Sequence, residues 1–178
     1  MIHPLGNLFR RKVTEDFSLK DEELERLGAQ LKERIASVFG RSLNIRELDS
    51  GSDNATEIEL VNLSNPFYDI ERFGVSFVAS PRHADVLIVT GAVTHNMEIA
   101  ARKTWDAMPS PKFVVAVGDD ACDGGIFKGT YAVNGGADTV LPVALKIPGN
   151  PPSPRTIMLG LLRLMEEIRN GTVSSTPG

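Results

Sequence analysis

Two short apolar runs constrain the fold of this chain more than any other feature. Residues 86–90 read VLIVT and residues 113–117 read FVVAV, and a glycine follows each run. Unbroken runs of this length, rich in Val and Ile, are typical of strands that are buried on both faces, as in a parallel sheet. A further strand is predicted at residues 43–48, where LNIREL alternates apolar and polar side chains.

Helical segments lie before, between and after these strands. The first is predicted at about residues 20–39, because apolar side chains recur there at steps of three and four, at Leu24, Leu27, Leu31, Ile35 and Val38. Two more are predicted at about residues 95–108 and 154–169, and the second begins with a serine cap followed by proline. Strands that alternate with helices predict an α/β fold, a flavodoxin-like three-layer sandwich with a mainly parallel sheet.

Length and composition predict one domain, because the chain has 178 residues of which 42% are hydrophobic. We expect a flexible arm at residues 1–17, the α/β domain at 18–170 and a disordered tail at 171–178. The net charge of −4, without a basic face, argues against nucleic acid as a partner. The one cysteine, Cys122, excludes an internal disulfide and a site with several thiolates.

Membrane signals are missing from the sequence pattern. No segment reaches the roughly 18 apolar residues of a membrane-spanning helix. The first residues, MIHPLGNLFRRK, lack the apolar stretch of a secretory signal. We therefore expect a cytoplasmic protein that reaches the inner face of a membrane only through a partner.

Three loops have an unusual composition: two follow predicted strands, and the third lies near the last strand of the chain. They are residues 49–57 (DSGSDNATE), 118–125 (GDDACDGG) and 147–152 (IPGNPP). In open parallel sheets, functional sites form in the loops beyond the carboxyl ends of the strands. Glycine lets such a loop turn tightly and approach a ligand, and proline makes it rigid. We expect the functional site of the chain in these loops.

The same loops carry a resemblance to a known family. GSDNATEIEL is similar to the motif GSCNGCEIE, VAVGDDACDGGIF to VAVGDCA-x-DGG, and IPGNPPSP to IPGCPP-x-P. The segment FYDIERFGVSFVASPRHADVLIVTGAVT also looks like that group. The chain resembles the small, 20-kilodalton subunit of NADH–quinone oxidoreductase and of membrane-bound group 4 nickel–iron hydrogenases of the formate hydrogenlyase type. The motifs occur in the right order, and the resemblance covers about residues 30–168.

The resemblance implies a cluster site whose ligands are absent here. Members of that family hold one four-iron, four-sulfur cluster with four cysteines, and these positions are occupied by Asp53, Thr56, Asp120 and Asn150. Iron–sulfur clusters need soft thiolate ligands, and two carboxylates, an alcohol and an amide are a poor substitute. Cys122 follows the third position by two residues, where relatives have no ligand. We therefore expect no cluster and no other cofactor.

The function implied by the resemblance is then that of a structural subunit. Such a chain would not be an enzyme alone, and would dock on a large catalytic-type subunit of a hydrogenase or complex I-like assembly. The exposed side of the helix at 97–108 and the loop at 66–83 are the expected contact surface. That loop supplies four aromatic side chains that are either anchors for the partner or ordinary core residues: Phe67, Tyr68, Phe73 and Phe77. Its histidine, His83, either contacts the partner or caps the loop.

Glu57 is a candidate for a second role, because it directly follows the second cluster position. In related hydrogenases a glutamate at this place resembles a proton relay toward the nickel–iron centre. Its position near the start of a short helix offers a simpler explanation, since the helix dipole favours a carboxylate there. Glu57 and Glu59 would face different sides of that helix, so the spacing predicts no catalytic pair.

Three alternatives stay open. The chain could be a working iron–sulfur electron-transfer subunit with atypical ligation by Asp53, Asp120 and an outside ligand. It could instead hold magnesium or calcium, or a small molecule, through carboxylates that otherwise solvate the vacated pocket or bond loop amides: Asp53, Asp119, Asp120 and Asp123. Finally, polar residues at all four positions would also suit a sequence redesigned to fold without metal.

Overall fold

The centre of the molecule is one sheet of parallel strands, and the computed structural model describes residues 21–173. In the order in which they lie side by side, the five strands are β2 (Val75–Phe77), β1 (Leu43–Asp49), β3 (Val86–Thr90), β5 (Phe113–Val117) and β7 (Val143–Ile147). Counting only these strands along the chain, the order is 2-1-3-4-5, which is the flavodoxin-like order. The predicted fold class is therefore confirmed.

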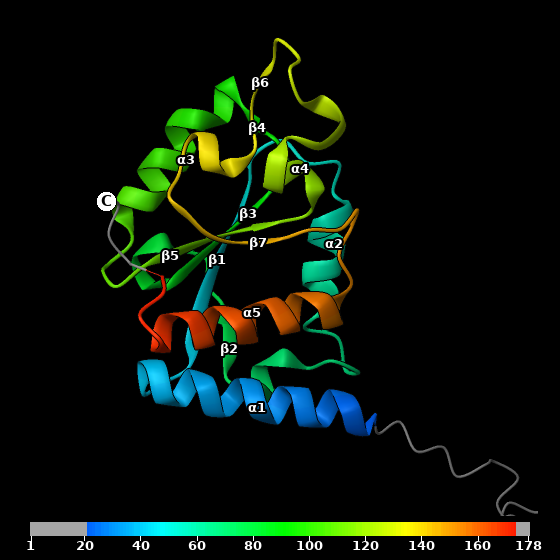
Figure 1. Cartoon of the computed structure of the whole chain (residues 1–178), viewed down its shortest axis with the longest axis vertical. Coiled ribbons are helices and arrows are strands. Elements are labelled where there is room, and N and C mark those ends of the chain that lie inside the picture. The colour runs from blue at the N-terminus through cyan, green and yellow to red at the C-terminus, as the bar shows by residue number, and fades with distance from the viewer. Residues whose placement is uncertain (1–20, 174–178) are drawn as a thin grey trace, which may run out of the picture.

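Helices cover both faces of this sheet. Two long helices, α1 (Glu22–Phe39) and α5 (Pro154–Arg169), lie side by side along one face, and α3 (His95–Ala107) lies over the other (Figure 1). Two short helices, α2 (Ala55–Asn62) and α4 (Asp119–Asp123), begin in the loops that follow β1 and β5. Within residues 21–173, no helix has the length and apolar character needed to cross a membrane.

Smaller elements complete the described chain. They are the 3-10 turns η2 (Ile70–Phe73), η3 (Pro81–His83), η4 (Gly125–Phe127) and η5 (Ala137–Thr139), and the antiparallel pair β4 (Val93–Thr94) and β6 (Val133–Gly135).

The two apolar runs form the middle of the sheet, as predicted. Every residue of β3 and β5 is buried, because alternate side chains enter two separate cores. Val86 and Ile88 pack toward α1 and α5, whereas Leu87 and Val89 pack toward α3. A central parallel strand has no solvent face, which explains why the run is apolar without interruption.

The long helices begin and end where the sequence indicates. Asp21 caps α1, since its Oδ1 accepts hydrogen bonds from the amides of Glu23 and Leu24, and Gly40 ends the helix in the left-handed region at φ 66°. Ser153 caps α5 through the amide of Thr156. The predicted arm at 1–17 and residues 174–178 of the predicted tail lie outside the described residues.

An ion pair at the amino end of the sheet yields a first prediction. The Arg41 guanidinium donates to both carboxylate oxygens of buried Asp85, at 2.8 and 2.6 Å, and Asp85 also accepts from the amide of Asn44 at 3.0 Å. Arg41→Ala would leave that carboxylate without its cation and should lower the free energy of unfolding by about 2 kcal/mol. This loss is smaller than that of a fully buried ion pair, because the Arg41 side chain is half exposed. Chemical denaturation measures the loss.

The matched control is Arg102→Ala, which removes a more exposed ion pair to Glu98 within one helix. That change should alter the free energy of unfolding by less than about 0.5 kcal/mol. Equal effects of the two substitutions would contradict a specific role for the Arg41–Asp85 pair.

Candidate functional site

The three unusual loops meet beyond the carboxyl ends of β1, β5 and β7 (Figure 1). Reciprocal hydrogen bonds join two of them. The amide of Asp119 donates to the carbonyl of Gly149 at 2.9 Å, and the amide of Gly149 donates to Asp119 Oδ1 at 2.8 Å. Segments thirty residues apart in the sequence are thereby held in one fixed arrangement.

Thr56 brings the loop at 49–57 into contact with the loops at 118–125 and 147–152. Its side chain is buried at the start of α2 and lies directly against Gly118. A Cβ atom at Gly118 would lie 2.7 Å from Thr56 Oγ1 and 3.7 Å from the carbonyl oxygen of Gly149, and the backbone there has φ 93°. Only glycine suits this turn, because the conformation is left-handed and the approach is close.

Asp120, Asp53 and Asn150 border the same end of the sheet. Burial raises the pKa of Asp120, and the nearby negative charge of Asp53 raises it further. Asp120 and Asn150 both line an open hollow of about 740 Å³, whose mouth also holds Ile126, Lys146 and Arg163. The four positions that the family resemblance assigns to cluster ligands therefore lie on loops at one end of the fold.

The donor atoms at these positions do not fit an iron–sulfur cluster. Asp53 Oδ1 accepts a hydrogen bond from the amide of Ala55 at 3.0 Å, Thr56 Oγ1 is pressed against Gly118, and Asp120 accepts from the backbone of Ile126. Asp53 and Asp120 thus stabilise their own loops. None supplies the soft, anionic sulfur that such a cluster requires.

Cys122 does not replace the missing ligands. Its side chain is buried in the core beneath α3, and its sulfur lies 3.7 Å from the carbonyl oxygen of Ala116. Burial raises the pKa of the thiol to about 11, so it stays protonated at neutral pH. Cys122 also lines the hollow beside Asp120 and Asn150, but one thiol cannot supply the four thiolates that such a cluster requires.

The acidic residues of the loops bear on the hard-metal alternative. Within residues 21–173, no three His, Cys, Asp or Glu side chains are placed to share a metal ion. Instead, Asp119 accepts from the amide of Gly149 and Asp123 accepts from the amide of Gly125 at 3.0 Å. Carboxylates that bond loop amides explain this acidic composition.

Glu57 is the unexpected feature of the site. Its side chain is only 8% exposed, and neither carboxylate oxygen has a hydrogen-bond partner among the described residues. Glu47 on β1 lies nearby: burial raises the pKa of Glu47, and the charge of Glu57 raises it further. Two acidic side chains thus share a partly dry environment between α2 and the sheet.

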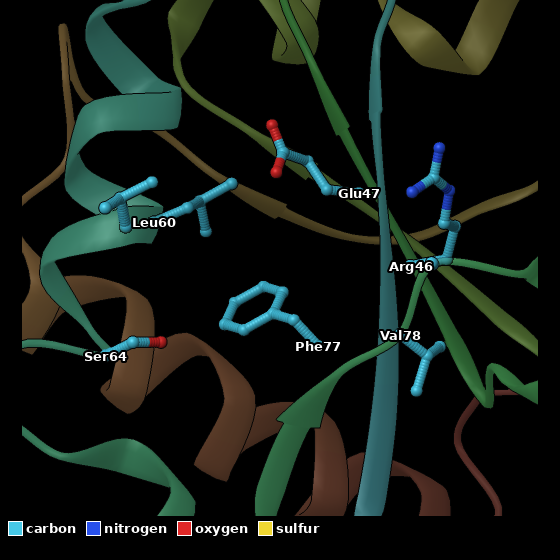
Figure 2. Close-up of a pocket in the computed structure, with 8 residues that line it drawn as sticks. Arg46, Glu47, Leu60, Ser64, Phe77 and Val78 are labelled. Carbon is cyan, nitrogen blue, oxygen red and sulfur yellow. The ribbon is translucent and has the colours of Figure 1, made fainter.

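Glu47 also lines a groove that opens beside this pair. The groove has a volume of about 340 Å³, and its walls are formed by Arg46, Glu47, Leu60, Val61, Ser64, Phe77, Val78 and Ala79. Figure 2 shows Glu47 and Phe77 reaching toward α2, while Arg46 and Val78 lie on the other side of β1. The walls are mainly apolar, with Glu47 as the acidic group.

Glu47 was not predicted from the sequence, although a signal for it exists. Strand alternation places residue 47 in one row with Leu43 and Ile45, whose side chains are fully buried. A glutamate in a row of core positions therefore marks an unusual site. Glu57 was singled out from the sequence, but the structure pairs it with Glu47 on another element rather than with Glu59 on its own helix.

The aromatic anchors predicted at residues 66–83 separate into different roles. Phe73 is a core residue, because it is buried and packs on Gly28 of α1, in agreement with the core alternative. Phe77 forms a wall of the groove, and exposed Phe67 stacks edge-on against Tyr68. The His83 side chain is exposed at the end of η3.

Comparison with known proteins gives consistent matches. Residues 54–164 match the profile of the family described as NADH ubiquinone oxidoreductase, 20 kDa subunit. The chain is 40% identical over 150 residues to formate hydrogenlyase subunit 7 of Escherichia coli (strain K12), an alignment that covers 83% of this chain and 57% of that protein. The chain therefore spans little more than half the length of this relative.

Solved structures agree with this result. A chain of the membrane-bound sulfane sulfur reductase, an archaeal respiratory membrane complex, has a TM-score of 0.68 at 33% identity, covering 81% of this chain and 78% of that chain. An NAD+-reducing NiFe hydrogenase in the H2-reduced state has a TM-score of 0.55 at 16% identity, covering 71% of this chain and 92% of that chain. The second similarity supports the fold alone.

The shared environment of Glu47 and Glu57 predicts a pH-dependent stability. Because the pKa of Glu47 is raised, the folded chain binds this proton more tightly than the unfolded chain. The stabilisation from protonated Glu47 is complete below the ordinary glutamate pKa of about 4.3 and is lost as the pH rises through the folded pKa. Glu47→Gln should therefore raise the melting temperature at pH 7, by an amount that shrinks toward pH 4.3.

Circular dichroism during heating, repeated across this pH range, measures the effect. The control is Glu59→Gln, on the same helix as Glu57 but only half-buried, which should give no such pH-dependent gain. A gain from Glu47→Gln that is equal at pH 7 and pH 4.3 would show that packing, rather than charge, is responsible.

Proposed function

This chain belongs to the NADH ubiquinone oxidoreductase 20 kDa subunit family, and we propose that it serves as a structural docking subunit without an iron–sulfur cluster. It would act in a complex I-like or hydrogenase-like assembly, beside a large catalytic-type subunit, and would have no enzymatic activity alone. Its link to a membrane would be indirect, at the inner face, through that complex.

The proposal rests on a site whose loops are held in a fixed arrangement although its four ligand positions lack thiolate side chains. The strand-end loops are locked together by the Asp119–Gly149 bonds and by the close approach of Thr56 to Gly118. Asp53 and Asp120 accept hydrogen bonds from nearby backbone amides, and none of the four ligand positions offers a thiolate. A frame of this kind can still shape an interface, but its side chains are a poor ligand set for the electron carrier.

Exposed apolar side chains around the frame support a docking role. Val61 on α2 is 69% exposed, Ile126 at the mouth of the hollow is 82% exposed, and Tyr131 in the following loop is 96% exposed. Large apolar side chains that are exposed to this extent can serve as anchors of a contact surface. On α3, which the sequence favoured, the exposed large apolar residue is Ile99 at 65%.

The named relatives support a partner within a larger assembly. One is a numbered subunit of formate hydrogenlyase, and another is part of an archaeal respiratory membrane complex. A role of Glu57 as a proton relay would need a redox centre in that partner. We assign no catalytic residue to this chain.

Cluster binding provides the direct test. After anaerobic incubation with iron and sulfide, the natural chain should show no broad absorbance band at roughly 400 nm and no stoichiometric iron, because thiolates are missing. The matched variant restores all four sulfur ligands: Asp53→Cys, Thr56→Cys, Asp120→Cys and Asn150→Cys. This variant should bind about four iron atoms per chain. A band in the natural chain would instead favour the working electron-transfer subunit with atypical ligation.

Docking is tested by recovery of the partner. The tagged full chain, expressed in its native host, should co-purify with a protein that mass spectrometry identifies as a hydrogenase or complex I large subunit. Ile126→Glu should reduce this recovery at least about tenfold, because a charge at the buried centre of an interface loses its water. Ile99→Glu on α3 is the control and should leave recovery unchanged. The reverse result would move the docking surface to α3.

A further inference from the structure

The groove beside Glu47 has an open sheet edge as its floor. β2 pairs with β1 only from Leu43↔Val75 to Ile45↔Phe77. The amide of Leu43 donates to Gly74 and the carbonyl of Ile45 accepts from Val78, so the odd residues of β1 point their backbone groups to this side. The backbone of Glu47 and Asp49 faces the same way, and no strand of residues 21–173 pairs with them there.

The unpartnered carboxylate of Glu57 lies next to the opposite wall of the groove. Leu60, Val61 and Ser64 of the α2 region line the groove, and Glu57 precedes them by three, four and seven residues. This spacing places all four on one helical face. Glu57 is itself buried and is not a lining residue, but it lies one turn before Leu60 and close enough to Glu47 to raise the pKa of Glu47.

We infer that an extended segment of the partner subunit adds to the open edge of β1 and sets a lysine or arginine side chain against Glu57. This inference rests on the proposed docking function and names the contact that the partner makes. Main-chain hydrogen bonds to Glu47 and Asp49 would hold the segment, and apolar neighbours of its cationic residue would fill the space between Leu60 and Phe77.

Three features select this occupant. A free strand edge offers hydrogen bonds to extended backbone, whereas a helix has already used its own. Two adjacent carboxylates, one of them buried without a partner, favour a cation over a neutral or acidic group. Arg46, the cation among the lining residues, projects from the other side of β1 (Figure 2), and its charge lowers the pKa of Glu47 by less than burial and Glu57 raise it. A metal ion would need a third ligand that residues 21–173 do not place there.

The experiment measures Glu57→Gln in two states. In the complex with the co-purified large subunit, the substitution should weaken binding at least about tenfold, because it removes one member of a buried charge pair. In the free chain it should do the opposite and raise the melting temperature by about 3 °C, because burying a neutral amide costs less than burying an unpaired carboxylate. A purely structural glutamate would lose stability in both states.

Hydrogen exchange tests the added strand. Backbone amides in a peptide covering residues 46–50 should exchange more slowly in the complex than in the free chain. Glu47→Pro removes the backbone amide that faces the groove and should therefore weaken binding. It leaves the backbone hydrogen bonds of Arg46 and Leu48 to β3 intact, so the free chain should still melt cooperatively. Unchanged exchange at these residues on binding would overturn the added strand.

Controls separate this inference from the proposed function. Glu59→Gln should leave binding unchanged. If the Glu57→Gln and natural chains have equal affinity for the large subunit, the inference fails and the docking function stands. If no large subunit is recovered, both fail. Residues 8–13 of the chain contain a basic run, Arg10, Arg11 and Lys12, which is an alternative source of the cation. The variant Arg10→Gln, Arg11→Gln and Lys12→Gln tests this alternative. A fall in the melting temperature of the free chain would identify residues 8–13 as the occupant and overturn the proposal.

Discussion

Parallel pairing of the central strands is the constraint on which the whole site depends. Because β1, β5 and β7 run in one direction, the loops that follow them emerge at the same edge of the sheet. Their positions are then fixed by short-range bonds such as those between Asp119 and Gly149. This arrangement needs no metal to hold it, because backbone groups and polar side chains satisfy one another across the loops.

The sequence predicts those parts of the fold in which one interaction dominates. Burial on both faces sets the apolar runs of β3 and β5, and a serine cap followed by proline sets the start of α5, so the bounds of these elements follow from the pattern. β2 has three residues, of which only Val75 is fully buried, and so leaves no periodic signal. It is held in place by pairing with β1, a contact between distant segments that no local pattern reveals.

The candidate site likewise contains features that the sequence predicts and features that only the structure reveals. The family motifs located the three loops, and the loss of thiolates followed from the residue types alone. The relation of Glu47 to Glu57 depends on the register of a strand against a helix, and was therefore visible only in the structure. Phe73 is a similar case: the sequence leaves open whether it contacts a partner or joins the core, and the structure shows that it ends a 3-10 turn and packs on Gly28 of α1.

The carboxylates at the ligand positions and the carboxylate of Glu57 differ in whether they have hydrogen-bond partners. At the ligand positions, the acidic side chains bond to nearby backbone amides, so the loops are stable with nothing bound. At Glu57, a carboxylate is buried where the described chain gives it no partner, which costs stability in the free protein. A group that destabilises the isolated chain is understandable if its compensation comes from another molecule. The unpartnered carboxylate of Glu57, more than the loops at the ligand positions, therefore supports the proposed contact with another subunit.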